Sequence, residues 1–198
     1  MGSVERLMGD EFVMVDGTAL VTEVLSRRVC RRMNNCVFII LKRMIKHDDM
    51  VAGLDITWFT SDDALVAICT WIGCVLIPLN SGSGYVTKLL SNKDITVVGV
   101  HMKENVSKMR RLLSRVEISN AVDVGELAAD LLHNPRLRRV GVRRLASEVL
   151  VFQLKSRPFA LSSIFFSMEP EHLTANQIEC VATDAYAAYK IGKKLLGF

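Results

Sequence analysis

One apolar stretch, residues 51–59, constrains the fold of this chain more than any other. Its sequence is VAGLDITWF, in which Asp55 is the only charged residue. A run of this length that is rich in β-branched and aromatic residues is typical of a strand buried on both faces. Because side chains alternate along a strand, Asp55 and Thr57 share one face. A buried carboxylate needs a cation or a hydrogen-bond network, so Asp55 indicates either a structural acid with a buried partner or part of a metal site.

The remaining elements are predicted from turn signals and hydrophobic periodicity. They are a hairpin over about residues 11–25 around Asp16-Gly17, a basic helix through Lys46, strands over 64–70 and 74–79, a strand over 95–102, a helix over 104–116, a short strand at 121–122, helices over 123–133 and 137–150, and a final helix opened by a capping box at Thr174. The short connection between the strands over 64–70 and 74–79 requires them to be antiparallel. We therefore predict one α/β domain over residues 1–198, in which three antiparallel strands are followed by strand–helix alternation in a mixed sheet with flanking helices.

Composition excludes several classes of protein. Hydrophobic residues make up 50% and charged residues 23%, which is typical of a globular chain and not of a disordered one. The apolar, uncharged run over residues 64–79 is short for a membrane span and contains Pro78, so we expect no membrane association. The five cysteines are odd in number and form no CxxC pair, which favours free thiols in a reducing compartment, cytoplasmic, nuclear or both.

The positive charge is gathered in three blocks. Residues 26–46, 106–115 and 131–147 hold seven, four and five Lys or Arg residues respectively, and none of the three blocks holds an acid. Such blocks suit a polyanion such as single-stranded nucleic acid, although solvated helix faces are the alternative for any one of them. The candidate nucleic-acid contacts are Lys108, Arg111, Arg115, Arg139 and Arg143.

Five segments stand in an order that matches one known family. They are AGLDITW at residues 52–58, VVGV with ENV at 97–100 and 104–106, DVGELA at 123–128, RRLA at 143–146 and QIECVATDA at 177–185. Together these segments resemble the Werner-type, DEDD-class 3′–5′ exonuclease domain, in particular its small stand-alone plant members. The resemblance covers about residues 10–198 and implies the ribonuclease H-like fold.

The resemblance also implies a chemistry, namely two-metal hydrolysis of a terminal phosphodiester with four acids and a tyrosine. Asp55 and Asp184 stand at the first and last acid positions. Thr57, Asn105 and Cys180 stand where the family has its second acid, its third acid and its tyrosine, so three of the five positions are altered. Because two carboxylates cannot balance two divalent ions, we expect either no metal or a single weakly held Mg²⁺ or Mn²⁺ between Asp55 and Asp184.

We therefore interpret the chain as a degenerate exonuclease fold, inactive or severely impaired, that binds single-stranded RNA or DNA. Two alternatives stay open. The chain could be an inactive subunit that associates with itself or with an active relative, or it could keep a residual metal-dependent 3′–5′ exonuclease activity. Salt-dependent binding of an oligonucleotide separates the first interpretation from the second, and turnover with Mn²⁺ tests the third.

Overall fold

The computed structural model describes residues 10–15, 18–24, 30–60, 63–79, 84–113, 116–151, 154 and 173–198. The strands are β1 (Asp10–Val15), β2 (Thr18–Val24), β3 (Val51–Thr60), β4 (Asp63–Thr70), β5 (Gly73–Pro78), β6 (Thr96–Gly99) and β7 (Ala121–Asp123). The helices are α1 (Cys30–His47), α2 (Gly84–Leu90), α3 (Met102–Leu112), α4 (Val124–Leu131), the short 3-10 helix η2 (Pro135–Arg139), α5 (Val142–Val149) and α7 (Ala175–Leu196).

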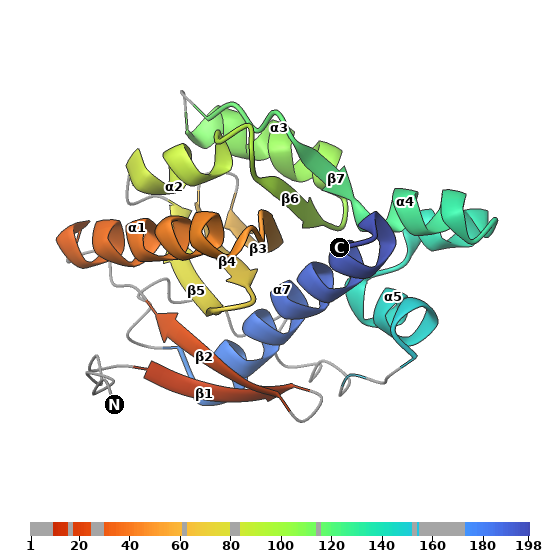
Figure 1. Ribbon diagram of the computed structural model, residues 1–198, viewed down its shortest axis with the longest axis horizontal. Coiled ribbons are helices and arrows are strands. Elements are labelled where there is room, and N and C mark those ends of the chain that lie inside the picture. Colours follow the sequence, from red (N-terminus) through yellow and green to blue (C-terminus); the bar gives the residue numbers. More distant parts are fainter. Residues whose placement is uncertain are drawn as a thin grey trace.

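These strands form a single mixed sheet in the order β1-β2-β5-β4-β3-β6-β7 (Figure 1). Strand β4 is antiparallel to both β3 and β5. On the other side of β3, β6 pairs with β3 in parallel, and β7 pairs with β6 in parallel. The predicted α/β fold, with antiparallel strands followed by strand–helix alternation, is confirmed. The hairpin of β1 and β2 also joins this sheet, because β2 pairs in parallel with β5, a pairing that the sequence does not reveal.

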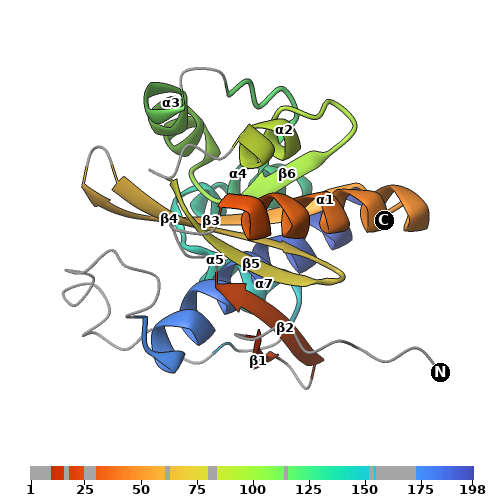
Figure 2. The same ribbon diagram turned by 90° about the vertical axis from the view of Figure 1, so that its left-hand side faces the viewer.

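Strand β3 separates two hydrophobic cores, and its side chains alternate between them. Val51 and Phe59 pack with residues of α4, α5 and α7, whereas Leu54 and Trp58 pack with residues of α1, α2 and α3. Figure 2 shows α2 and α3 on one side of the sheet and α5 and α7 on the other. By the same alternation, Asp55 and Thr57 lie on the face of β3 that α7 covers.

Helix α7 is the longest of the described helices and lies directly against β3. It begins with the predicted capping box, in which the Thr174 hydroxyl accepts from the Gln177 amide and the Gln177 side chain accepts from the Thr174 amide at 2.7 Å. A Cβ atom added at Gly53 would lie 2.2 Å from the carbonyl oxygen of Ala185. The absence of a side chain at Gly53 therefore lets the two backbones touch.

The single helix predicted over residues 137–150 is wrong. The structure has η2 and α5 in its place, separated by Gly141, which is the N-cap residue of α5. The side chain of Asn134 accepts from the amide of Arg136, and Pro135 occupies the first position of η2. Asn134-Pro135 is a strong signal for the start of a helix, and Gly141 allows a second helix to start after it. Two short helices therefore replace the single long one.

The strand predicted over residues 95–102 ends early, at Gly99, because α3 begins at Met102. One carboxylate oxygen of Asp123 accepts from the Met102 amide at 2.9 Å, and the other accepts from the amides of Gly125 and Glu126 at the start of α4. Asp123 thus caps two helices at once, which fixes α3 and α4 relative to each other.

Two further properties concern membrane-spanning helices and cysteine chemistry. Within the described residues, no helix has both the length and the apolar character needed to span a bilayer. Cys69, Cys74 and Cys180 are buried free thiols, and burial raises the pKa of Cys69, so its thiol stays protonated.

Candidate functional site

The two aspartates expected at the site, Asp55 and Asp184, lie on segments that touch. Asp55 is two residues beyond Gly53 on β3, and Asp184 precedes Ala185, whose carbonyl oxygen faces Gly53. Asp184 is 3% exposed, and Asp55 is partly buried. The fold therefore brings to one place two residues that stand far apart in the sequence.

The guanidinium of Arg143, on α5, binds Asp184. Nε of Arg143 donates to Oδ1 of Asp184 at 2.6 Å, and Nη2 of Arg143 donates to Sγ of Cys180 at 3.0 Å. The side chains of this ion pair are 20% and 4% exposed, for Arg143 and Asp184 respectively. A carboxylate this deeply buried needs a positive partner, and here the guanidinium supplies that charge.

Thr57 stands at the position where the resemblance places the second acid. Its Oγ1 is buried and has no hydrogen-bond partner among the described residues. A neutral hydroxyl brings no negative charge to a cation, and hard divalent ions prefer carboxylate oxygen. Thr57 therefore brings no charge to this position and leaves a buried polar atom there.

Asn105, where the resemblance places the third acid, has a structural role in β3–α3 packing. Its Oδ1 accepts from Nε1 of Trp58 at 3.0 Å, while its Nδ2 donates to the carbonyl oxygen of Val100 at 3.1 Å. A carboxylate could accept from the indole but could not donate to the carbonyl. Asn105 thus uses both ends of its amide to join β3 to the first turn of α3.

These residues do not fit a pair of divalent ions. Asp184 is paired with Arg143, and Thr57 and Asn105 are neutral. Within the described ranges, no group of three or more His, Cys, Asp or Glu side chains is placed to hold a metal ion. Glu104, beside Asn105, binds Lys108 at 2.6 Å on the exposed side of α3, and this hydrogen bond lowers the pKa of Glu104.

Replacing Asn105 with aspartate is expected to destabilise the protein by about 1–3 kcal/mol, because the Val100 carbonyl loses its donor and faces a carboxylate. Urea denaturation measures the change. Asn92→Asp is the matched control, since within the described residues the Asn92 side chain only accepts a hydrogen bond, from the amide of Asp94, and aspartate keeps that bond. Equal stability of the two variants would show that the Nδ2 bond of Asn105 contributes nothing.

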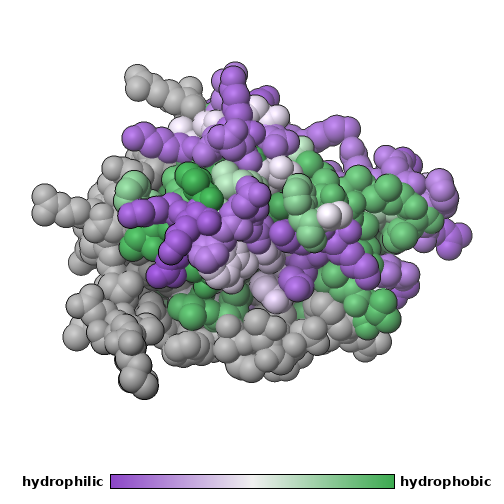
Figure 3. All heavy atoms as spheres, in the orientation of Figure 1, coloured by the Kyte–Doolittle hydropathy of each residue, from purple (hydrophilic) through white to green (hydrophobic). Residues whose placement is uncertain are grey.

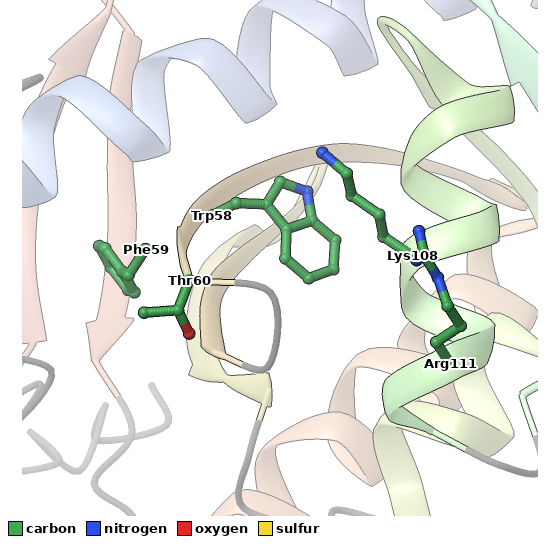
Figure 4. Close-up of a pocket in the computed structure, with 5 residues that line it drawn as sticks. All are labelled: Trp58, Phe59, Thr60, Lys108 and Arg111. Atoms are coloured by element: carbon green, nitrogen blue, oxygen red, sulfur yellow. The ribbon is translucent and has the colours of Figure 1, made fainter.

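The residues predicted to contact nucleic acid lie in different surroundings. Lys108 and Arg111 project from α3 and line a cavity of about 320 Å³ with Trp58, Phe59 and Thr60 (Figure 4). Arg139 is exposed on η2. Arg143 is drawn inward to Asp184, and Arg115 lies outside the described residues.

One further polar cluster was missed by sequence reasoning. The Tyr189 hydroxyl donates to Oδ2 of Asp49 at 2.6 Å, and Nζ of Lys193 lies 3.2 Å from Oδ1. Burial, together with the neighbouring Asp49 carboxylate, raises the pKa of Tyr189, which keeps the phenol protonated as a donor. The cluster fastens the C-terminal half of α7 to the residues just before β3. No local pattern predicts a contact across this sequence distance.

Comparison with known proteins supplies the context for this site. A family model described as 3′–5′ exonuclease matches residues 21–197. A crystal structure of the EXD2 exonuclease domain soaked in Mn and GMP is 24% identical, with 89% of this chain and 90% of that chain covered and a TM-score of 0.47. The same domain soaked in Mn and Mg is 26% identical, with 83% and 84% covered and a TM-score of 0.44. A search of curated proteins found no significant match.

Proposed function

We propose that this chain, which belongs to the 3′–5′ exonuclease family, is an inactive or severely impaired member that binds single-stranded nucleic acid. The observation that carries the loss of activity is the ion pair between Arg143 and Asp184. It gives the last acid of the site a fixed guanidinium partner from the protein itself.

Charge balance supports the proposal. A pair of divalent ions needs several carboxylates around it, because each carboxylate offsets only one positive charge. Here Asp55 and Asp184 supply two, and Arg143 cancels one of them. Thr57 and Asn105 add none. Any single Mg²⁺ or Mn²⁺ between the two aspartates would have to lose bound water and displace the Arg143 guanidinium, which is already paired with Asp184.

Exposed cations support nucleic-acid binding. The chain has a net charge of +4, and α3 and η2 present exposed basic side chains. Among these, Arg111, Arg136 and Arg139 make no ion pair within the described part of the chain. Cations of this kind bind phosphate and release counterions from the strand, and this binding does not require a catalytic site.

The test uses the purified full chain with labelled single-stranded RNA and DNA. We expect no trimming in Mg²⁺ or Mn²⁺ and no rise in melting temperature with either ion. We also expect strand binding that weakens steeply as salt is raised. Strand trimming that is lost in Asp55→Ala would overturn the assignment of inactivity. A strand affinity that does not change with salt concentration would overturn the role of the basic surface.

A second candidate function, a protein-interaction subunit, is favoured by the outward face of α1. Phe38, Ile39 and Ile45 are 57%, 43% and 64% exposed there. Figure 3 shows hydrophobic and hydrophilic side chains intermixed over the described parts of the face that carries this helix. Light scattering of the purified chain, alone and with an active relative, distinguishes this candidate, because an interaction subunit gives a complex of higher mass.

A further inference from the structure

A cavity at the end of β3 has the size and lining of a small-molecule site. Its volume is about 320 Å³, and its walls are Trp58, Phe59 and Thr60 from β3 with Lys108 and Arg111 from α3. In Figure 4 the Trp58 indole points from β3 toward α3, from which Lys108 and Arg111 extend. We call this cavity the Trp58 pocket. Ligand pockets in proteins begin at about 300 Å³ and combine an apolar surface with a few polar groups.

The orientation of the Trp58 ring is fixed by hydrogen bonding. Its Nε1 donates to Asn105, and the Asn105 amide is itself held by the Val100 carbonyl. The indole N–H is therefore already used, and what remains for a ligand is the aromatic surface. A fixed aromatic ring binds a planar ligand well because little rotational freedom is lost, and every nucleobase can stack on it.

The opposite wall of the Trp58 pocket is cationic. Nζ of Lys108 lies 5.5 Å from the centroid of the Trp58 ring. Lys108 also pairs with Glu104, whose side chain is 66% exposed, and an exposed pair of this kind is weak enough for a phosphate to displace.

Arg111 is three residues further along α3, on the same side of the helix. It is exposed and makes no ion pair within the described ranges. Its planar guanidinium can bind two phosphate oxygens at once.

An aromatic ring facing two cations matches a ligand with a planar base and an anionic group. We propose that the Trp58 pocket binds one nucleotide of a single strand, with the base on Trp58 and the phosphate between Lys108 and Arg111. This proposal rests on the proposed function and names the unit that is recognised. Binding here needs no divalent ion, because the charge that meets the phosphate comes from side chains.

Tryptophan fluorescence provides a direct test. The chain has two tryptophans, so Trp71→Phe leaves Trp58 as the single reporter. In EDTA, we expect a nucleoside monophosphate and a short oligonucleotide to quench this emission. The matching nucleoside and inorganic phosphate should each bind at least about tenfold more weakly, because each offers only half of the contacts.

Neighbouring arginines on α3 provide the matched variants. In the Trp71→Phe background, Arg111→Gln should weaken nucleoside monophosphate binding about tenfold, because a charge-assisted contact to phosphate is lost. Arg110→Gln should leave it unchanged, since Arg110 lines a different cavity with Met102 and Asp123. Both side chains are exposed, so neither substitution is expected to disturb folding.

The outcomes separate this proposal from the broader one. Salt-dependent strand binding without any change in Trp58 emission would overturn the pocket and leave the proposed function standing. Quenching by a nucleoside monophosphate without strand binding would overturn the proposed function and the assignment of the ligand to a strand, and would leave the Trp58 pocket as a site for a free nucleotide. Equal losses of nucleoside monophosphate affinity in Arg111→Gln and Arg110→Gln would show that the phosphate does not lie in the Trp58 pocket. This result would also overturn the pocket proposal.

Discussion

Replacing Gly53 with alanine is expected to destabilise the protein by at least about 3 kcal/mol, a large part of the total stability of a domain. The added Cβ would lie 2.2 Å from the carbonyl oxygen of Ala185 and 2.5 Å from the amide nitrogen of Tyr189. Both atoms belong to the backbone of α7, so no side-chain rotation can relieve the clash. Either α7 separates from β3 or the central strand is distorted.

Urea denaturation followed by circular dichroism measures the effect on Gly53→Ala. Gly141→Ala is the matched control, because a Cβ at Gly141 meets no atom within 4 Å. Its φ of −74° suits any residue, so its stability should change by less than about 1 kcal/mol. A native denaturation midpoint for Gly53→Ala would contradict the close packing of α7 on β3, which brings the segments that carry Asp55 and Asp184 together.

Replacing Arg143 with methionine is expected to destabilise the protein by about 3–5 kcal/mol, because Asp184 stays buried while its guanidinium partner is removed. Adding Asp184→Asn to this variant should recover much of the loss, since the buried charge is then gone as well. A thermodynamic cycle built from the two single variants and the double variant gives the coupling energy of the pair.

Arg144→Met is the control for this series. Arg144 is the neighbouring residue on α5, and its side chain is 68% exposed in a pair with Glu148, so its loss should cost about 1 kcal/mol or less. Strictly additive effects of Arg143→Met and Asp184→Asn would mean that the pair contributes no coupling. A loss of strand affinity without a loss of stability would instead place Arg143 on the nucleic-acid surface.

The parts of the fold that were predicted correctly depend on short stretches of sequence. The alternation along β3 sets which face carries Asp55, and Thr174 with Gln177 defines the start of α7 by local hydrogen bonds. The division of residues 137–150 was missed although its signals, Pro135 and Gly141, were present. Arginines recur at helical spacing on both sides of Gly141, at Arg136, Arg139 and Arg143, so periodicity alone predicts one continuous helix.

The site was only half predictable. The altered positions Thr57, Asn105 and Cys180 came from an ordered resemblance, but their present partners did not. Arg143 lies 41 residues from Asp184 and stands in a block of similar arginines, so nothing in the sequence marks it as the buried one. Burial and pairing depend on how α5 docks on α7, which is a property of the assembled molecule.

The hydrogen bonds at both ends of the Asn105 amide bear on whether this protein could acquire a four-carboxylate site. A mutation of Asn105 to aspartate loses the hydrogen bond to Val100 at once. Metal binding would need two further changes, an acid at position 57 and the replacement of Arg143. Each early step lowers stability with no new ligand bound, so selection for a folded chain acts against the intermediates. The hydrogen bonds of Asn105 therefore oppose the stepwise conversion of this site into a four-carboxylate site.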